Sequence, residues 1–289
     1  MPPFATRYRT ETVEGYDLFV REAGDPAYPT VVLLHGFPAS SFMFRDLITA
    51  LSDRYHVIAP DHLGFGHSAS PPVEEFEYTF ERLSELTLAL LDQLEIAKFA
   101  LYVQDYGAPI GLRIASRYPD RVTALISQNG NAYVEGFTPF WDGLFAYAAD
   151  GVANAAEVRA SLDPPGTQWV YTHGVPADRV QRLSPDTWTL DQVSLDRPGN
   201  REVQLALFRD YRFNLDEYPA FQAYFRAHQP PALIVWGEHD EIFGPDGARA
   251  FTRDLPDAEI HLLDAGHYAL ETSGDEIAAL VRSFLGRVV

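Results

Sequence analysis

The sequence of 289 residues predicts an α/β fold, in which a mostly parallel, eight-stranded sheet carries helices on both faces and a helical segment is inserted into it. Three observations predict this class. Short runs rich in Val, Ile and Leu alternate with longer segments whose apolar residues are spaced by three and four. A long segment in the second half lacks such runs. After that segment the alternation of strands and helices returns.

The first half of the chain contains the predicted start of the sheet. An antiparallel hairpin at the sheet edge is expected from Arg7–Val13 and Tyr16–Glu22, which flank a Glu-Gly turn. Buried strands are then predicted at Thr30–Gly36, His56–Asp61, Phe99–Asp105 and Val122–Gly130. Helical spacing lies between them at Ser41–Leu51, Thr79–Leu94 and Ala108–Tyr118. Strand and helix in this order imply a right-handed, parallel arrangement.

An inserted segment divides the predicted core into two parts. From 133 to 228 the sequence holds aromatic residues, prolines and short helical patterns instead of strands. Strands and helices resume at Ala232–Glu238, Asp246–Asp254, Ala258–Gly266 and Gly274–Leu285. We therefore predict a core of residues 1–132 and 229–289, with a helical cap at 133–228. Such an insertion covers the carboxyl ends of the strands, where open α/β folds bind their ligands.

Composition and charge exclude several classes of function. The formal net charge of −19 disfavours nucleic acid and anionic membranes as partners. The absence of cysteine excludes disulfides and thiolate chemistry. The first residues have no apolar core typical of a signal peptide, and no apolar run is long enough to cross a bilayer. We expect a soluble, cytoplasmic protein that uses no cofactor and no metal, and the oligomeric state stays open.

Four short motifs fall at the ends of predicted strands. They are His35-Gly36-Phe37-Pro38, Val103-Gln104-Asp105-Tyr106-Gly107, Gly237-Glu238-His239-Asp240 and Ala265-Gly266-His267-Tyr268. Their chain order of nucleophile, acid and histidine is typical of one catalytic triad. With these four motifs in register, the chain resembles the α/β-hydrolase fold superfamily from end to end.

Asp105 stands where most members of that superfamily carry a serine nucleophile. The position is a tight strand-to-helix turn, and Gly107 supplies the small residue that the turn needs two positions later. Taken alone, Asp105 would be interpreted as the cap of the following helix. Because the other motifs lie in register, we interpret it as the nucleophile.

An aspartate nucleophile predicts a particular chemistry. A carboxylate with an ordinary pKa near 3.9 is ionised at neutral pH and can attack a saturated carbon to form an ester. His267 would then activate the water that hydrolyses this ester, and Asp240 would orient the imidazole. Glu238 and Glu241 are rival acids, but the resemblance selects Asp240. In some dehalogenases the acid follows the preceding strand, where the nearest acid here is Glu135.

The resemblance also implies an oxyanion hole. Its donors would be the backbone N–H groups of Phe37 and Tyr106. The alternative for the His-Gly-Phe-Pro segment is an ordinary Gly-Pro loop. Because the segment directly follows a predicted parallel strand, the functional interpretation is favoured.

Epoxide hydrolases and haloalkane dehalogenases are the two groups that this pattern resembles, and the cap distinguishes them. Phe208–Asn214 is similar to the cap motif of soluble epoxide hydrolases, in which a tyrosine protonates the departing oxygen. This similarity implies that role for Tyr211, with Tyr171 as the candidate second tyrosine and Tyr133 and Tyr147 as alternatives. The stretches Gln128–Gly136 and Asp210–Arg226 resemble a yeast-type branch of the epoxide hydrolases.

Dehalogenases instead bind a halide with indole or amide N–H groups. This chain has Tyr106 where many of them carry tryptophan, and Phe37 where several carry asparagine. The cap tryptophans, Trp141, Trp169 and Trp188, are possible replacements. We expect Trp141 and Trp169 to line the pocket for a small, apolar to moderately polar electrophile.

The sequence therefore predicts hydrolysis of an epoxide to a vicinal diol. The alternatives are haloalkane dehalogenation by the same triad, and a catalytically silent receptor of the same fold that binds a small molecule.

Overall fold

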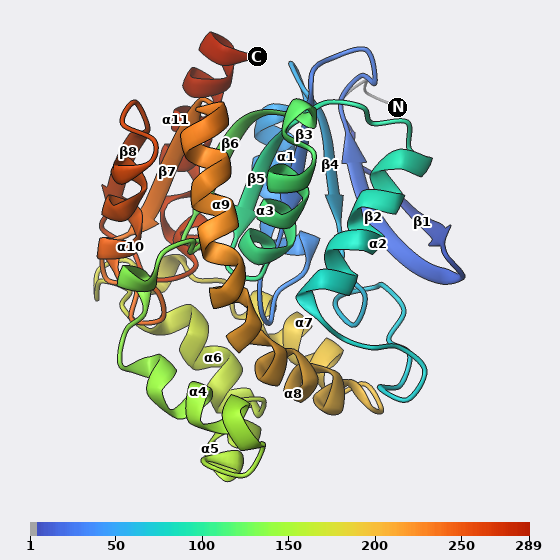
Figure 1. The fold of residues 1–289 in the computed structure, drawn as a ribbon, viewed down its shortest axis with the longest axis vertical. Helices are drawn as coiled ribbons and strands as arrows, with labels where there is room; N and C mark the ends of the chain where they lie inside the picture. Colours follow the sequence, from blue (N-terminus) through green and yellow to red (C-terminus); the bar gives the residue numbers. More distant parts are fainter. Residues whose placement is uncertain (1–4) are drawn as a thin grey trace.

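The computed structural model describes residues 5–289 and contains the predicted sheet (Figure 1). Its strands lie in the order β1-β2-β4-β3-β5-β6-β7-β8. Their bounds are β1 Arg7–Val13, β2 Tyr16–Ala23, β3 Thr30–Leu34, β4 His56–Pro60, β5 Phe99–Gln104, β6 Val122–Gln128, β7 Ala232–Gly237 and β8 Glu259–Leu263. The strands from β4 to β8 pair in parallel, whereas β1 and β2 are antiparallel at one edge. The predicted fold class and edge hairpin are confirmed.

The central strands are mostly apolar because helices cover both faces of the sheet. Every residue of β4, β5 and β7 is buried. On one face lie α1 (Arg45–Leu51) and α11 (Ala269–Val288), which contact each other. On the other face lie α2 (Phe80–Gln93), α3 (Gly107–Arg117) and α9 (Asn214–His228). A short helix, α10 (Pro245–Ala250), follows β7.

The inserted helices gather at one end of the sheet, below the carboxyl ends of the strands in Figure 1. They are α4 Phe140–Asp150, α5 Ala155–Ala160, α6 Pro164–Thr172, α7 Pro185–Leu195 and α8 Asn200–Asp210. Single 3₁₀ turns occur at η1 Ser41–Phe44, η2 Pro119–Arg121, η3 Val134–Gly136, η4 Val180–Arg182, η5 Tyr211–Phe213 and η6 Phe251–Arg253.

The position of helix α9 differs from the predicted domain division. The sequence places it in the cap, which was expected to extend to residue 228, but in the structure α9 packs beside α3 on the sheet (Figure 1). Its Phe221 and Phe225 are fully buried, and Arg113 of α3 donates a hydrogen bond to Asn214 at its start. Helical spacing shows that a helix has an apolar face but does not show which neighbour covers it.

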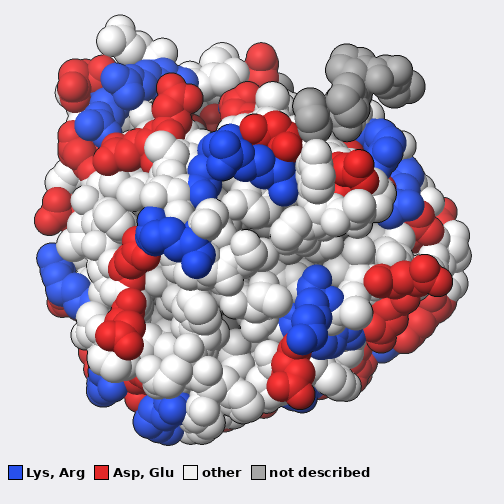
Figure 2. Space-filling model, turned by 90° about the horizontal axis from the view of Figure 1, so that it is seen from above, with Lys and Arg blue, Asp and Glu red and all other residues white. Residues whose placement is uncertain are grey.

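The surface carries interspersed charges of both signs. Figure 2 shows the end of the molecule that lies away from the cap, where basic and acidic side chains alternate. Charged side chains of the described residues form ion pairs, for example Arg117 with Glu81 and Arg282 with Asp53. Within residues 5–289, none of the helices is long and apolar enough to cross a membrane.

Candidate active site

The nucleophile position is a strained turn between β5 and α3. Asp105 adopts a left-handed backbone conformation with φ of +48°, which is uncommon for a residue other than glycine. A side chain at Gly107 would collide with the carbonyl oxygen of Leu34 on the neighbouring strand, and one at Gly36 would collide with Asp105 itself. These two glycines therefore let three backbone segments meet around the Asp105 carboxylate.

The three predicted triad residues lie together at the carboxyl ends of the strands. His267 Nδ1 is 2.8 Å from Asp240 Oδ2, and His267 Nε2 is 3.8 Å from Asp105 Oδ2. All three side chains are buried. The rival acids Glu238 and Glu241 are both exposed, so they do not compete for the imidazole.

Asp240 is fixed by groups on two sides of its carboxylate. The backbone N–H groups of Ile242 and Phe243 donate to its Oδ1 at 2.8 and 3.1 Å. The Asn129 side chain donates to its Oδ2 at 2.7 Å. Sequence analysis missed this role of Asn129, although the loop after β6 was considered as the place for an acid. The amide therefore occupies the place considered as the alternative position of the triad acid, and it holds Asp240 against His267.

The electrostatics of the site couple the imidazole to both carboxylates. Burial disfavours the charged form of His267, but the nearby charges of Asp240 and Asp105 outweigh this effect and raise its pKa. Burial also raises the pKa of Asp105, opposed by His267 and by the N–H groups of Phe37 and Tyr106. A carboxylate with so little hydration is a stronger nucleophile than one in water.

Both backbone groups expected in the oxyanion hole contact the carboxylate. The Phe37 N–H donates to Asp105 Oδ1 at 2.7 Å, and the Tyr106 N–H also hydrogen-bonds to this carboxylate. Oδ2, in contrast, faces His267. The two oxygens are therefore distinguished: one is held by the backbone, and the other lies on the side of the base.

Gln104 is a further polar residue that sequence analysis did not assign. Its side chain is fully buried, and its Nε2 lies 2.9 Å from His267 Nε2. The donor is the amide, so the imidazole accepts on Nε2 and donates from Nδ1 to Asp240. A buried glutamine in an otherwise apolar central strand is the signal that could have identified it.

An apolar cavity of about 250 Å³ opens onto the nucleophile. Its lining consists of Phe37, Asp105, Tyr106, Phe140, Trp141, Leu144, Ser161, Gly166, Trp169, Val170, Phe208 and Ile242. Trp141 and Trp169, the predicted pocket residues, are both among them. A larger and more polar cavity of about 520 Å³ lies between α1 and α11 and contains no triad residue.

The cap tryptophans differ in what their rings can offer a ligand. The indole N–H of Trp141 donates to the carbonyl oxygen of Ile242 at 2.8 Å, so it is already occupied. Trp188 lies outside the catalytic cavity, with its ring 6.0 Å from that of Tyr171. Trp169 lines the cavity and stacks on Phe140, which is partly exposed at the surface.

Tyr211 lies in the 3₁₀ turn η5 that joins the cap to α9. Its hydroxyl hydrogen-bonds to that of Tyr218, which also accepts a bond from Asn131 at 3.3 Å. Burial, then the neighbouring Tyr218 and the charge of Asp105, raise the pKa of Tyr211 well above 10. Tyr211 is therefore a neutral donor close enough to the nucleophile to be affected by its charge.

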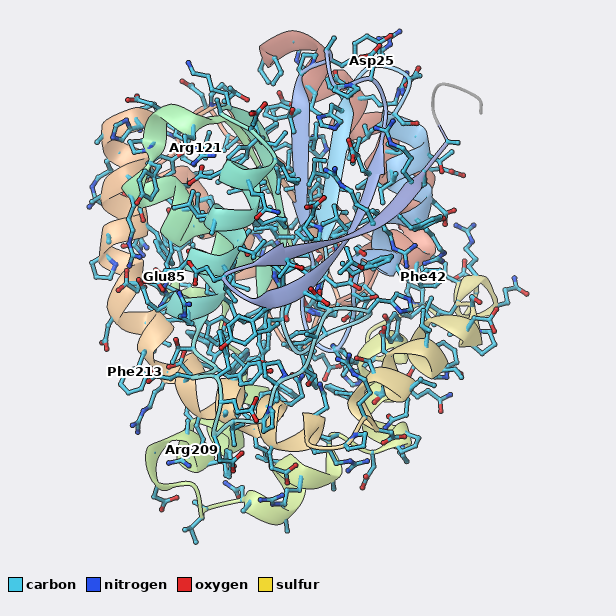
Figure 3. The ribbon with its side chains drawn as sticks, turned by 90° about the vertical axis from the view of Figure 1, so that its right-hand side faces the viewer. Asp25, Phe42, Glu85, Arg121, Arg209 and Phe213 are labelled. Carbon is cyan, nitrogen blue, oxygen red and sulfur yellow. The ribbon has the colours of Figure 1, made fainter. Side chains whose placement is uncertain are left out.

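The turn also explains the spacing of the Tyr-Arg-x-Asn sequence. Tyr211 and Asn214 are buried, whereas Phe213 between them is 48% exposed and projects from the surface (Figure 3). Asn214 Oδ1 accepts a hydrogen bond of 2.8 Å from Arg113, a buried residue of α3. Because α3 begins beside the nucleophile, this bond fixes Tyr211 relative to Asp105.

The structure does not bring Tyr171 to the nucleophile. Its hydroxyl donates to the buried carboxylate of Asp191 at 2.5 Å, and its ring stacks on that of Tyr268 at 4.0 Å. The Tyr268 hydroxyl donates to the Phe37 carbonyl oxygen at 2.7 Å. These contacts from Asp191 through Tyr171 and Tyr268 to Phe37 link the cap to the core. Because the Tyr171 hydroxyl already donates to Asp191, Tyr171 does not take the place of the expected second tyrosine.

The alternative tyrosines have no contact with the triad that the structure records. The Tyr133 hydroxyl donates to Asp254 at 2.9 Å, and Tyr147 is buried in α4. Neither Tyr147 nor Tyr211 is among the residues that line the described cavity. Within residues 5–289 there is also no group of three or more His, Asp or Glu side chains arranged to hold a metal ion.

Comparisons with known proteins cover nearly the whole chain. The family model described as alpha/beta hydrolase fold matches residues 29–273. An uncharacterized hydrolase of Saccharomyces cerevisiae is 41% identical over 270 residues, 92% of each chain. Haloalkane dehalogenase 1 of Mycobacterium tuberculosis is 32% identical over 278 residues, 89% of this chain and 83% of that one. The structure of the haloalkane dehalogenase DatA from Agrobacterium tumefaciens aligns with a TM-score of 0.82 at 22% identity, covering 99% and 98% of the two chains.

Proposed function

The chain belongs to the α/β-hydrolase fold family, and on that premise we propose that it opens epoxides to vicinal diols through an ester on Asp105. The observation that carries this proposal is a buried carboxylate, not a hydroxyl, at the elbow, with the Tyr211 ring 5.8 Å from the ring of Tyr106, the next residue. A phenol donates a proton to an oxygen that stays attached to the product, which is what epoxide opening requires.

In the first step Asp105 Oδ2 attacks one carbon of the epoxide. The new carbon–oxygen bond forms as the ring bond to oxygen breaks, and that oxygen takes the electron pair. Tyr211 transfers its proton to this oxygen. The other carboxylate oxygen, Oδ1, becomes the carbonyl oxygen of the ester and stays on the Phe37 N–H.

In the second step water hydrolyses the ester. His267 takes a proton from the water, and Asp240 stabilises the resulting imidazolium. Attack on the ester carbonyl places negative charge on Oδ1, where the Phe37 N–H already points, and the Tyr106 N–H also bonds to this carboxyl group. The bond between the carboxyl carbon and the diol oxygen breaks, and the second proton of the attacking water passes to that oxygen. Asp105 is thereby regenerated as a carboxylate, and the proton held by His267 restores the phenol.

Dehalogenation by the same triad is the second candidate. It is favoured by Trp169 in the cavity wall and by the 32% identical mycobacterial dehalogenase. Against it, Phe37 offers no side-chain amide and the Trp141 indole is occupied by Ile242. We therefore rank it below epoxide hydrolysis.

The test is intact mass spectrometry of the His267→Asn variant incubated separately with a small aryl epoxide and a bromoalkane. Without the base the ester should accumulate, because only its hydrolysis needs His267. A mass gain equal to the whole epoxide, mapped to Asp105, supports the proposal. A gain of the alkyl group with bromide release supports dehalogenation instead. No adduct from either reagent contradicts the role of Asp105 and favours a binding protein.

A further inference from the structure

A buried tyrosine holds the oxyanion loop, residues 35–39. Tyr268 is only 1% exposed, and its hydroxyl donates to the carbonyl oxygen of Phe37 at 2.7 Å. The same hydroxyl oxygen also bonds to the backbone N–H of Ala39. Phe37 is the residue whose own N–H donates to Asp105 Oδ1. One side chain therefore bonds to two backbone groups of the loop that carries this oxyanion donor.

The ring of Tyr268 is itself held, so its hydroxyl has a defined position. Tyr171 of the cap stacks on it, with ring centroids 4.0 Å apart and 13° between the ring planes. The His267 ring lies nearly at right angles to it, with centroids 5.2 Å apart. Because Tyr268 directly follows His267 in the chain, the base and the side chain that holds the loop belong to one turn. The position of the oxyanion loop is therefore tied to that of the base.

The Tyr268 hydroxyl stays a neutral donor. Burial, followed by the charges of Asp191 and Asp105, raises the pKa of Tyr268 well above its ordinary value near 10. A carbonyl oxygen can only accept a hydrogen bond, so the bond to Phe37 requires the phenolic proton. This bond is therefore present at neutral and acidic pH.

We propose that Tyr268 is a positioning residue for the oxyanion hole, because its hydroxyl holds the Phe37 carbonyl group and thereby keeps the Phe37 N–H aimed at Asp105 Oδ1. This inference rests on the proposed ester mechanism and adds a residue to it. Tyr268 is not among the residues that line the described cavity. It acts on the reaction through the backbone of Phe37, a residue that is only partly buried and belongs to a loop.

The two chemical steps need the Phe37 N–H to different degrees. Oδ1 carries part of the carboxylate charge in the free enzyme, and this charge decreases when Asp105 becomes an ester. A less well aimed N–H should therefore leave ester formation unchanged or slightly faster, since the N–H stabilises the reactant more than the product. In the second step Oδ1 takes up a negative charge, and hydrogen bonds to charged groups are roughly twice as strong as neutral ones. Poorer aim should thus slow hydrolysis selectively.

The test compares Tyr268→Phe with Tyr78→Phe during turnover of a small aryl epoxide at saturating concentration. Tyr78 is a matched control, because it is also buried and its hydroxyl donates to a loop carbonyl oxygen, that of Pro71, at 2.8 Å. Within the part of the chain that the structure describes, it neither lines the catalytic cavity nor bonds to a triad residue. Each variant loses one buried hydrogen bond, so the melting temperature should fall by a similar amount in both.

Two quantities give the rate constants of both steps. Rapid quenching followed by intact mass measures the fraction of enzyme that is present as the ester, and diol formation measures turnover. Turnover divided by the esterified fraction is the rate constant of hydrolysis. Turnover divided by the remaining fraction is the rate constant of ester formation.

We expect hydrolysis in Tyr268→Phe to slow about 10-fold. This is less than the loss of about 10²-fold for complete removal of an oxyanion donor, because the Phe37 N–H remains but is less well aimed. The esterified fraction should rise, while ester formation stays at the parental rate or slightly above it. Tyr78→Phe should keep both parental rate constants. A merely structural role would lower turnover without raising the esterified fraction.

Parental rate constants in folded Tyr268→Phe would overturn this inference and leave the proposed function intact. A decrease in ester formation as large as that in hydrolysis would also overturn it, as would equal changes in both variants, because neither result points to Oδ1. If the parent protein forms neither ester nor diol from the epoxide, the proposed function itself fails, and the inference fails with it.

Discussion

The sheet and the cap hold their candidate site residues in different ways. On the strand side, Asp105, Asp240 and His267 each follow a strand of the parallel sheet, and backbone N–H groups hold both carboxylates. On the cap side, the phenols are held by side chains of a following helix, as Tyr171 is by Asp191 of α7 and Tyr211 is by Tyr218 of α9. The sheet therefore determines where Asp105, the proposed nucleophile, lies, whereas side-chain packing determines where the cap phenols lie.

Removal of the nucleophile should have the largest effect. In Asp105→Ala we expect turnover to fall by at least about 10⁴-fold, because the covalent step is lost altogether. Steady-state diol formation measures the loss, and circular dichroism confirms the fold. Full turnover in this variant would contradict every role assigned to the strand side.

Asp240→Asn should separate the two chemical steps. An amide in this place disfavours the required tautomer of His267 and removes the charge that stabilises the imidazolium, so ester hydrolysis should slow by about 10⁴-fold. Ester formation should change little, because it needs no base. Rapid-quench mass spectrometry measures both rates. An equal decrease in both would show that Asp240 has a role in the first step as well.

On the cap side, Tyr211→Phe should show the opposite pattern. We expect ester formation to slow by about 10²-fold, since a general acid is lost, while hydrolysis of a preformed ester is unchanged. The same rapid-quench experiment tests this. If hydrolysis were the slowed step, Tyr211 would belong functionally with the strand side.

The strand side also contains two buried, neutral histidines that contact each other, His35 of the His-Gly-Phe-Pro turn and His62. Burial lowers the pKa of His35 to about 4, only partly offset by its bond to the Gly36 carbonyl, and burial lowers that of His62 well below 6.5. In the unfolded chain these two histidines bind protons near pH 6.5, whereas in the folded chain they do not. Their contribution to the free energy of unfolding is therefore fully present above pH 6.5 and decreases as the pH falls towards about 4.

On acidification from neutral pH to about pH 5, we expect the free energy of unfolding to decrease by at least about 2 kcal/mol from this source. Urea denaturation across this range measures it. Constant stability between neutral pH and about pH 5 would contradict the neutral state of the pair.

The smallest effect is expected for Tyr171→Phe, the counterpart of Tyr211→Phe. It should lower the free energy of unfolding by on the order of 1 kcal/mol, because the hydrogen bond to Asp191 is lost. Ester formation should stay close to the parental rate. A decrease as large as that in Tyr211→Phe would restore Tyr171 to the role expected from the sequence.

The sequence predicted the strand side well because strand ends and tight turns leave local patterns. The alternation of strands and helices located the sheet, and the Gly residues around Asp105 located the elbow. Partners that come from other segments, such as Asn129 for Asp240, left no local pattern, and the only sign of Gln104 is its polarity within an apolar strand.

The cap was predicted less completely for the same reason. Tyr211 belongs to a local motif, and the structure explains its spacing through Asn214 and Arg113. Tyr171 has no such context, and its commitment to Asp191 depends on how α6 packs on α7. The side of the sheet on which α9 lies is likewise a matter of tertiary contacts.

The central claim is that oxygen from the Asp105 carboxylate, and not from water, first joins the substrate carbon. It is tested most directly by a single turnover of an epoxide in heavy-oxygen water with enzyme in excess, followed by mass analysis of the diol and of the peptide that contains Asp105. We predict that the diol carries no label and that one labelled oxygen appears in the Asp105 carboxylate. Label in the diol with none in Asp105 would mean that water attacks the ring directly, and would contradict the account.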